Sequence, residues 1–206
     1  RGVHFKPDIV ILQFYRNDVE DYYLSQEYKK AYQQIPIPFK KALRRTALYN
    51  ALMKMKLYVL AKRIGKKNRD LQSISDASEE FYDDRSGEHF APMWEKYLSR
   101  LTETAVFCKK RGISLVLVVI PDEFQVIHAN LAPKPQVILK DFARKNGVFF
   151  VDPLETLRTY YRSGKQAYIE GDSHLNAAGQ RIVADQIFTA LEQNKLLVPR
   201  KAVRTH

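Results

Sequence analysis

An aspartate and a histidine two positions apart have the clearest chemical potential in the chain. They lie in residues 171–176, which read Gly-Asp-Ser-His-Leu-Asn. In an extended loop, residues i and i+2 point to the same side, so the carboxylate of Asp172 can reach Nδ1 of His174. Nε2 of the imidazole is then left to take a proton from a hydroxyl, as in a pair of orienting acid and general base. The spacing alone also allows a structural interpretation, in which Asp172 makes a turn and His174 packs against the following helix.

The same segment contains a literal Gly-Asp-Ser, which holds the nucleophile of some esterases. Ser173 lies between Asp172 and His174, and in an extended loop this placement points its side chain away from both neighbours. We therefore predict that Ser173 is not a nucleophile and that the working residues are the two that flank it.

Asn17 is a second candidate, near the N-terminus. It follows an apolar run at residues 9–12 that is typical of a buried parallel strand. Its carboxamide N–H₂ can donate to a developing oxyanion, although asparagine is also a common turn former at a strand end. Parallel sheets place their sites at the carboxyl ends of strands. We therefore expect Asn17 to share one edge with Asp172 and His174.

The elements that must position these residues alternate between strand and helix patterns. Strands are predicted at residues 8–15, 114–120 and 148–151. Helices are predicted at residues 42–64, 92–111, 135–145, 154–162 and 177–193, with Asn176 capping the last. Residues 22–40 are predicted to be irregular because Pro36 and Pro38 interrupt them. Such alternation implies a mostly parallel sheet covered by helices on both faces.

The net charge of +11 is concentrated in one segment. Residues 28–69 contain thirteen basic residues and no Asp or Glu, and the rest of the chain is nearly balanced. A local basic segment can contact an anionic surface such as lipid headgroups or an acidic polymer, or it can simply be a solvated helix with loops. No groove-reading or strand-reading pattern accompanies the charge, so nucleic-acid binding is not expected.

Composition indicates one globular domain over residues 1–206, with a basic helical insertion at about 28–91. Hydrophobic residues make up 45% of the chain, which is ordinary for such a domain. No apolar stretch approaches the roughly 18–20 residues that span a bilayer. Cys108 is the only cysteine, so no internal disulfide is expected. No metal-ligand cluster or phosphate loop is visible, so neither a metal ion nor a cofactor is expected.

Two blocks of the sequence resemble those of the SGNH (GDSL-like) hydrolases. Residues 6–18, which begin Lys-Pro-Asp-Ile-Val-Ile-Leu and end Asn-Asp, resemble the third block of that family, and residues 171–179 resemble the fifth. The strand patterns within 113–121 and 147–153 also fit its layout. The resemblance covers most of the chain, with residues 22–90 the least diagnostic. It implies a flavodoxin-like, three-layer α/β/α fold with a mostly parallel sheet.

The resemblance assigns roles position by position. His174 matches the catalytic base, Asp172 the acid that orients it, and Asn17 the asparagine of the oxyanion hole. The nucleophilic serine of the family lies in a Gly-Asp-Ser turn further upstream, whereas residues 1–16 contain no serine. We therefore expect this chain to lack the first strands and the nucleophile block and to show no turnover by itself. The strand at residues 8–15 would then form a sheet edge.

The implied function is that of a serine-type esterase acting on acyl or acetyl esters. Two positions depart from the family pattern: Tyr15 replaces a frequent glycine, and the Asp-x-His spacing replaces Asp-x-x-His. The shorter spacing is similar to that of SGNH-like O-acyltransferases that modify polysaccharides and also to that of some esterases, so hydrolysis and acyl transfer are both open. A non-catalytic domain that binds anionic surfaces through residues 28–69 is a further alternative. The expected partner is an ester substrate (a small molecule, a lipid or an acylated glycan), and export or membrane association is compatible with the sequence.

Overall fold

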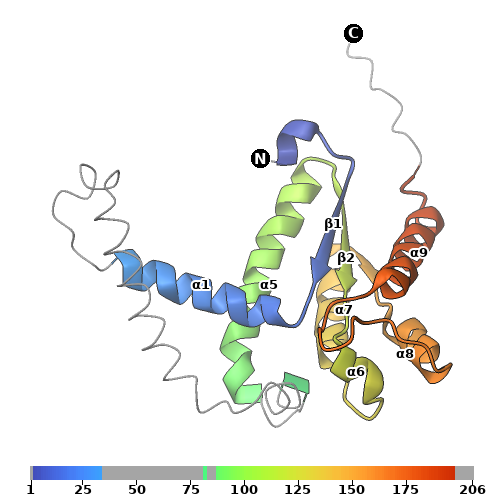
Figure 1. Cartoon of the computed structure of the whole chain (residues 1–206). Helices are drawn as coiled ribbons and strands as arrows, with labels where there is room; N and C mark the ends of the chain where they lie inside the picture. The colour runs from blue at the N-terminus through green and yellow to red at the C-terminus, as the bar shows by residue number, and fades with distance from the viewer. Residues whose placement is uncertain (1, 34–80, 83–86, 198–206) are drawn as a thin grey trace, which may run out of the picture.

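Three parallel strands form the centre of the molecule (Figure 1). The computed structural model describes residues 2–33, 81–82 and 87–197. Strands β1 (Ile9–Phe14), β2 (Ser114–Val119) and β3 (Phe149–Val151) pair in the order β1-β2-β3. The register places Leu117 of β2 between Leu12 of β1 and Phe150 of β3. Within the described part of the sheet, β1 therefore lies at an edge, as predicted.

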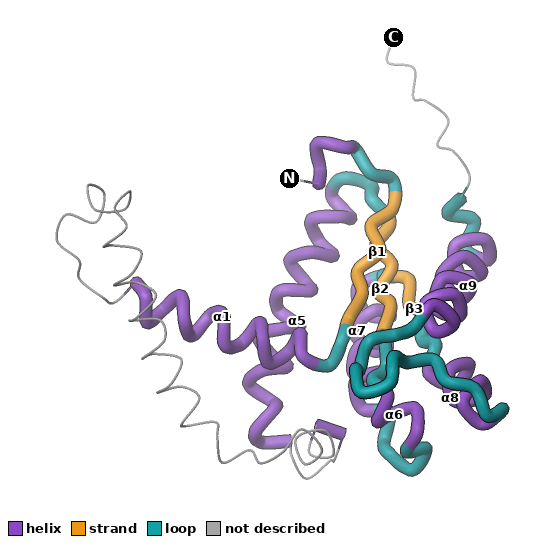
Figure 2. The backbone as a smooth tube through the Cα atoms, viewed as in Figure 1, coloured by secondary structure: helices purple, strands orange, loops and turns teal. Residues whose placement is uncertain are grey.

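Helices connect the strands and cover both faces of the sheet. The connection from β1 to β2 contains α1 (Asn17–Gln33) and α5 (Gly87–Lys110), and the one from β2 to β3 contains α6 (Glu123–Ile127) and α7 (Lys134–Asn146). A short 3-10 helix, η1 (Gly2–Phe5), precedes β1, and α8 (Leu154–Arg162) and α9 (Ala177–Gln193) follow β3. Figure 2 shows the strands enclosed between α5 and α9. Within the described ranges, no helix combines the length and the hydrophobicity needed to span a bilayer.

The central strand β2 divides its side chains between two hydrophobic cores. Leu115, Leu117 and Val119 belong to the core shared with α1, α5 and α7. Val116 and Val118 belong to the core shared with α6, α8 and α9. Successive strand residues face opposite sides of a sheet, so burial on both faces explains the uninterrupted apolar run of β2. The predicted three-layer α/β/α arrangement around a parallel sheet is confirmed.

The second half of the chain agrees closely with the predicted elements. Helices α8 and α9 have the predicted bounds, and α7 extends one residue further at each end. Asn176 caps α9 as predicted, because its Oδ1 accepts hydrogen bonds from the backbone N–H groups of Ala178 and Gly179 at 2.9 and 3.0 Å. Helix α6 was not predicted.

In the first half of the chain, the helices differ from the predicted elements. Residues 22–40 were predicted to be irregular, but α1 continues to Gln33. The prolines at 36 and 38 lie beyond this end, Asp18 in the first turn suits the helix N-terminus, and Tyr22 packs edge-on against Tyr97 of α5. The helix predicted from Pro92 begins at Gly87. The predicted helix at 42–64 lies outside the described residues.

Aromatic packing accounts for the earlier start of α5. The ring of Phe81 lies 5.2 Å from the ring of Phe90 and 5.8 Å from the ring of Trp94. All three side chains are buried in the core on the α5 side of the sheet. Burying large aromatic rings outweighs the local tendency of Pro92 to mark a helix start.

Candidate active site at the carboxyl edge of the sheet

The carboxyl ends of β1 and β2 point toward the loop that precedes α9 (Figures 1 and 2). This loop, residues 163–176, is called the dyad loop below because it carries Asp172 and His174. The start of α1, which contains Asn17, and the start of α6 lie at the same edge of the sheet. The candidate residues are therefore gathered where parallel sheets place their sites.

Asp172 and His174 are in direct contact. Oδ1 of Asp172 contacts Nδ1 of His174 and also accepts a hydrogen bond from the backbone N–H of His174 at 3.0 Å. These bonds, the side-chain contact first, hold the pKa of Asp172 below its usual range, so the carboxylate stays ionised to a lower pH than an ordinary aspartate. The His174 side chain is 83% exposed, so it does not pack against α9. Among the described residues, Nε2 of His174 has no hydrogen-bond partner.

Backbone hydrogen bonds fold the dyad loop into a tight reversal. The N–H of Asp172 donates to the carbonyl of Ile169, and the N–H of Ile169 donates to the carbonyl of His174, each at 2.9 Å. Gly171 adopts a φ of 72° in this turn, a left-handed conformation that favours glycine. The loop backbone thus brings the carboxylate and the imidazole to the same side of a closed turn.

Asn176 joins the dyad loop to α9. Besides capping the helix, its Nδ2 donates to the carbonyls of Gln166 at 2.8 Å and Tyr168 at 3.2 Å. Its backbone N–H donates to the carbonyl of Ala167 at 2.9 Å. The base of the loop and the first turn of α9 therefore cannot separate without loss of several hydrogen bonds.

Gly179 permits this close packing, which leads to a stability prediction. A Cβ at this position would lie 2.2 Å from the carbonyl oxygen of Ala167 and 2.8 Å from Cδ2 of Leu175. We expect Gly179→Ala to lower the free energy of unfolding by about 2–3 kcal/mol, measured by denaturant unfolding. The reverse substitution at an exposed position of the same helix, Ala184→Gly, provides the comparison. It should lower the free energy of unfolding by about 1 kcal/mol, through helix propensity alone. If Gly179→Ala stabilised the protein instead, the close approach would be wrong.

A buried polar cluster connects the dyad loop to the ends of β1 and β2. The hydroxyl of Tyr168 donates to the carbonyl of Pro121 at 2.8 Å. Next along the chain, Oδ1 of Asp122 accepts from the N–H of Gln125 at 2.7 Å and caps α6, while Oδ2 lies 3.2 Å from Nε of Arg16. Burial, and then the charge of Asp122, raise the pKa of Tyr168, so its hydroxyl stays a neutral donor. The cluster therefore joins the dyad loop, the segment after β1 and the segment after β2.

Asn17 is the first residue of α1, with an exposed side chain. Its Nδ2 donates to Oδ2 of Asp21 at 3.0 Å, one turn along the same helix. Two hydrogen bonds between Tyr15 and Asp18 close the turn that leads from β1 into α1. The N–H of Asp18 donates to the carbonyl of Tyr15 at 2.9 Å, and the N–H of Tyr15 donates to the Asp18 carboxylate at 2.8 Å. The structure brings Asn17 to the predicted edge, and its oxyanion role stays a prediction.

Residues 78–206 match the family model of an SGNH hydrolase-like domain, acetyltransferase AlgX. The chain belongs to this family. The matched range is more than half of the SGNH hydrolase-like chain and contains β2, β3 and the dyad loop, whereas β1 and Asn17 precede it. No curated protein and no solved structure matches the chain.

Sequence reasoning about this SGNH hydrolase-like chain missed Tyr15 and Asp122. An acid in the turn that follows the strongest strand was an available signal for Asp122. Tyr15 was noted only as a replacement for a frequent glycine, and nothing in the sequence indicated that its hydroxyl contacts the carbonyl of Ser173, 158 residues away, at 3.3 Å. Among the described residues no hydrogen bond joins the Ser173 hydroxyl to His174, and no group of three His, Cys, Asp or Glu side chains could hold a metal ion.

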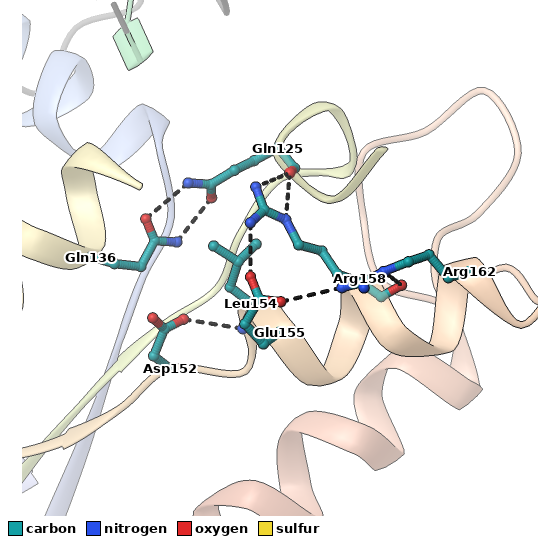
Figure 3. A network of polar contacts seen from close by, with 7 residues as sticks. All are labelled: Gln125, Gln136, Asp152, Leu154, Glu155, Arg158 and Arg162. Atoms are coloured by element: carbon teal, nitrogen blue, oxygen red, sulfur yellow. Dashed lines mark hydrogen bonds and ion pairs between the residues drawn. The ribbon is translucent and has the colours of Figure 1, made fainter. Parts of the chain in front are cut away.

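A buried amide network positions α6 within the SGNH hydrolase-like domain (Figure 3). The side-chain amides of Gln125 and Gln136 exchange two hydrogen bonds, at 2.8 and 2.9 Å, and so join α6 to α7. Nε and Nη2 of Arg158 in α8 both donate to the backbone carbonyl of Gln125, at 3.3 and 3.1 Å. Because α6 begins directly after Asp122, this network also sets the position of the polar cluster at the end of β2.

Proposed function

We propose that this chain carries the acid–base pair of an O-acyltransferase, which moves an acyl group from an ester donor to a hydroxyl acceptor. The observation that supports this most directly is the contact between Asp172 and His174, with Nε2 of the imidazole exposed. The pair lies within the range that matches the acetyltransferase family. The family description favours transfer over hydrolysis, although the same pair suits both reactions.

The proposed reaction uses the pair in two similar half-reactions. Nε2 of His174 takes the proton of the nucleophilic hydroxyl while that oxygen bonds to the ester carbonyl carbon. The Asp172 carboxylate stabilises the resulting imidazolium, which returns the proton to the departing alkoxide and leaves an acyl-enzyme. An acceptor hydroxyl then gives its proton to Nε2 and attacks the acyl carbon, and the nucleophile recovers the proton. Asn17 is the proposed donor to the oxyanion.

In the proposed reaction the nucleophile is a serine in a turn ahead of the Asn17 segment, by analogy with the SGNH hydrolases. The experiment therefore uses the protein as it is produced in the cell, with p-nitrophenyl acetate as the acyl donor. We expect His174→Ala to reduce nitrophenol release by about 10²–10⁴-fold, because the hydroxyl loses its general base. The exposed His128, which ends α6, provides the control, and His128→Ala should leave the rate unchanged. Full activity of His174→Ala would refute the proposal.

A product analysis separates transfer from hydrolysis. With a neutral oligosaccharide present as acceptor, transfer gives an acetylated sugar that mass spectrometry detects, and hydrolysis gives acetate alone. We expect the acetylated sugar in the wild type and its loss in His174→Ala. Acetate as the sole product, with the same dependence on His174, would replace transfer by hydrolysis and keep the acid–base pair.

A second proposal concerns the basic residues within 28–69, which we infer contact an anionic surface. The charge excess of the whole chain lies in this segment, and each basic residue near an anionic membrane contributes about 1 kcal/mol. Replacing Lys40, Lys41, Arg44 and Arg45 with glutamine should weaken binding to phosphatidylserine vesicles at least about tenfold in cosedimentation. The same substitution at the exposed residues 109–111 should have little effect. Equal binding to neutral phosphatidylcholine vesicles would contradict the proposal.

A further inference from the structure

The peptide unit between Ser173 and His174 is held on both sides. Its N–H, which belongs to His174, donates to the Asp172 carboxylate at 3.0 Å. Its carbonyl, which belongs to Ser173, accepts a hydrogen bond from the hydroxyl of Tyr15 at 3.3 Å. The carbonyl of His174 itself accepts from the N–H of Ile169 at 2.9 Å. The backbone on either side of the imidazole is thus fixed by three contacts, and one of them comes from a distant strand end.

Several contacts hold Tyr15 itself in a fixed position, so its hydroxyl can hold the dyad loop in place. It directly follows β1, and its backbone N–H and carbonyl both bond to Asp18 in the first turn of α1. The next residue, Arg16, forms an ion pair with the buried Asp122 at the end of β2. Burial, and then the charge of Asp122, raise the pKa of Tyr15, so its hydroxyl remains protonated and available as a donor.

We propose that Tyr15 is a positioning residue, whose hydroxyl aligns the Ser173–His174 peptide and thereby the Asp172–His174 pair with the edge of the sheet that carries Asn17. This inference rests on the proposed function, since it concerns the orientation of the same pair. The hydroxyl of Tyr15 donates to the carbonyl of Ser173. Tyr15 therefore acts through the Ser173–His174 peptide, whose N–H donates to the Asp172 carboxylate.

Hydrogen bonding gives this arrangement an effect beyond simple tethering. A donor on the carbonyl of a peptide polarises it and strengthens the donor capacity of the N–H on the same unit. The hydroxyl of Tyr15 should therefore strengthen the bond from the His174 N–H to Asp172, which is one of the two bonds that lower the pKa of Asp172. At 3.3 Å the bond is long for a hydroxyl donor, so it should contribute little to global stability.

The test is Tyr15→Phe, which removes only the hydroxyl, in the protein as it is produced in the cell. By solvent-exchange NMR, we expect the His174 amide proton to exchange about three- to tenfold faster. In an NMR titration, the pKa of the Asp172 carboxyl should rise toward its ordinary value. The kcat for acyl transfer should fall about three- to tenfold with KM unchanged, and the unfolding temperature should change by less than about 2 °C. An unchanged exchange rate at His174 together with an unchanged Asp172 titration would overturn the inference.

Tyr168→Phe is the matched comparison, because its hydroxyl binds the carbonyl of Pro121 at the base of the same loop. This hydroxyl is buried, so its removal should lower the unfolding temperature measurably, unlike the removal of the Tyr15 hydroxyl. The same global loss in Tyr15→Phe would make Tyr15 merely structural and overturn the proposal. The NMR readouts are independent of turnover. If His174→Ala kept full activity, the proposed function would fail while the NMR result still decided whether Tyr15 aligns the loop.

Discussion

Replacing Asp172 with asparagine is expected to lower kcat for acyl transfer by about 10²–10⁴-fold. The substitution keeps the size of the side chain but removes the charge that stabilises the imidazolium of His174 and holds its tautomer. KM should change little, because Asp172 contacts the base rather than a bound substrate in the proposed reaction. Steady-state kinetics on the protein as it is produced in the cell provide the measurement.

Glu170 provides the control for this prediction. It is an exposed carboxylate two residues before Asp172 in the same loop, so Glu170→Gln makes the same chemical change without touching the pair. We expect kcat of this variant to equal that of the wild type. If both variants lost activity equally, the general charge of the loop, and not the contact with His174, would be responsible.

The pH dependence of the Asp172 contribution to stability has a definite sign. Its folded-state pKa is lowered, first by the side chain and then by the backbone N–H of His174. The stabilisation is therefore fully present above the ordinary carboxyl pKa of about 4 and is lost as the pH falls through the lower folded-state pKa. The difference in unfolding temperature between the wild type and Asp172→Asn should shrink over that interval. A difference that grew with acidification would contradict the lowered pKa.

Local signals account for the parts of the structure that the sequence predicted well. The apolar periodicity of α9 and its cap at Asn176 lie within one stretch of chain. A spacing of two residues indicated the contact between Asp172 and His174, and the backbone turn at Gly171 completes it. The alternation of strands and helices likewise predicted the parallel sheet. Each of these features is indicated by a pattern that is local in the sequence, although the strands that pair in the sheet are far apart along the chain.

Long-range packing decides the features that sequence reasoning missed. Helix α1 forms although prolines follow it closely, because its side chains pack on α5. The ion pair between Arg16 and Asp122 and the bond from Tyr15 to Ser173 join residues more than a hundred positions apart. The residues of these two contacts become neighbours only when β1, β2 and the dyad loop meet at one edge of the sheet. No local sequence pattern therefore predicts that they pair.

Arg158 is expected to be the most costly side chain to remove from this edge. It is 7% exposed, and two of its nitrogens donate to the backbone carbonyl of Gln125 while Nη1 binds Glu155 at 2.8 Å. We expect Arg158→Ala to lower the free energy of unfolding by about 3–4 kcal/mol, measured by denaturant unfolding. The loss combines a buried carbonyl left without its donors and the volume of the missing side chain.

Arg162 provides the control, because it shares the positive charge and the Glu155 partner of Arg158 but is not buried. It lies one turn further along α8 and binds the same carboxylate, Glu155, at 3.2 Å, but its side chain is 63% exposed. An exposed ion pair contributes about 0–1 kcal/mol, so Arg162→Ala should be nearly neutral. Similar losses in the two variants would mean that the shared ion pair with Glu155, rather than the carbonyl of Gln125, determines stability. A large loss confined to Arg158 would instead show that the α6 segment, and with it Asp122 at the end of β2, is held in place from α8.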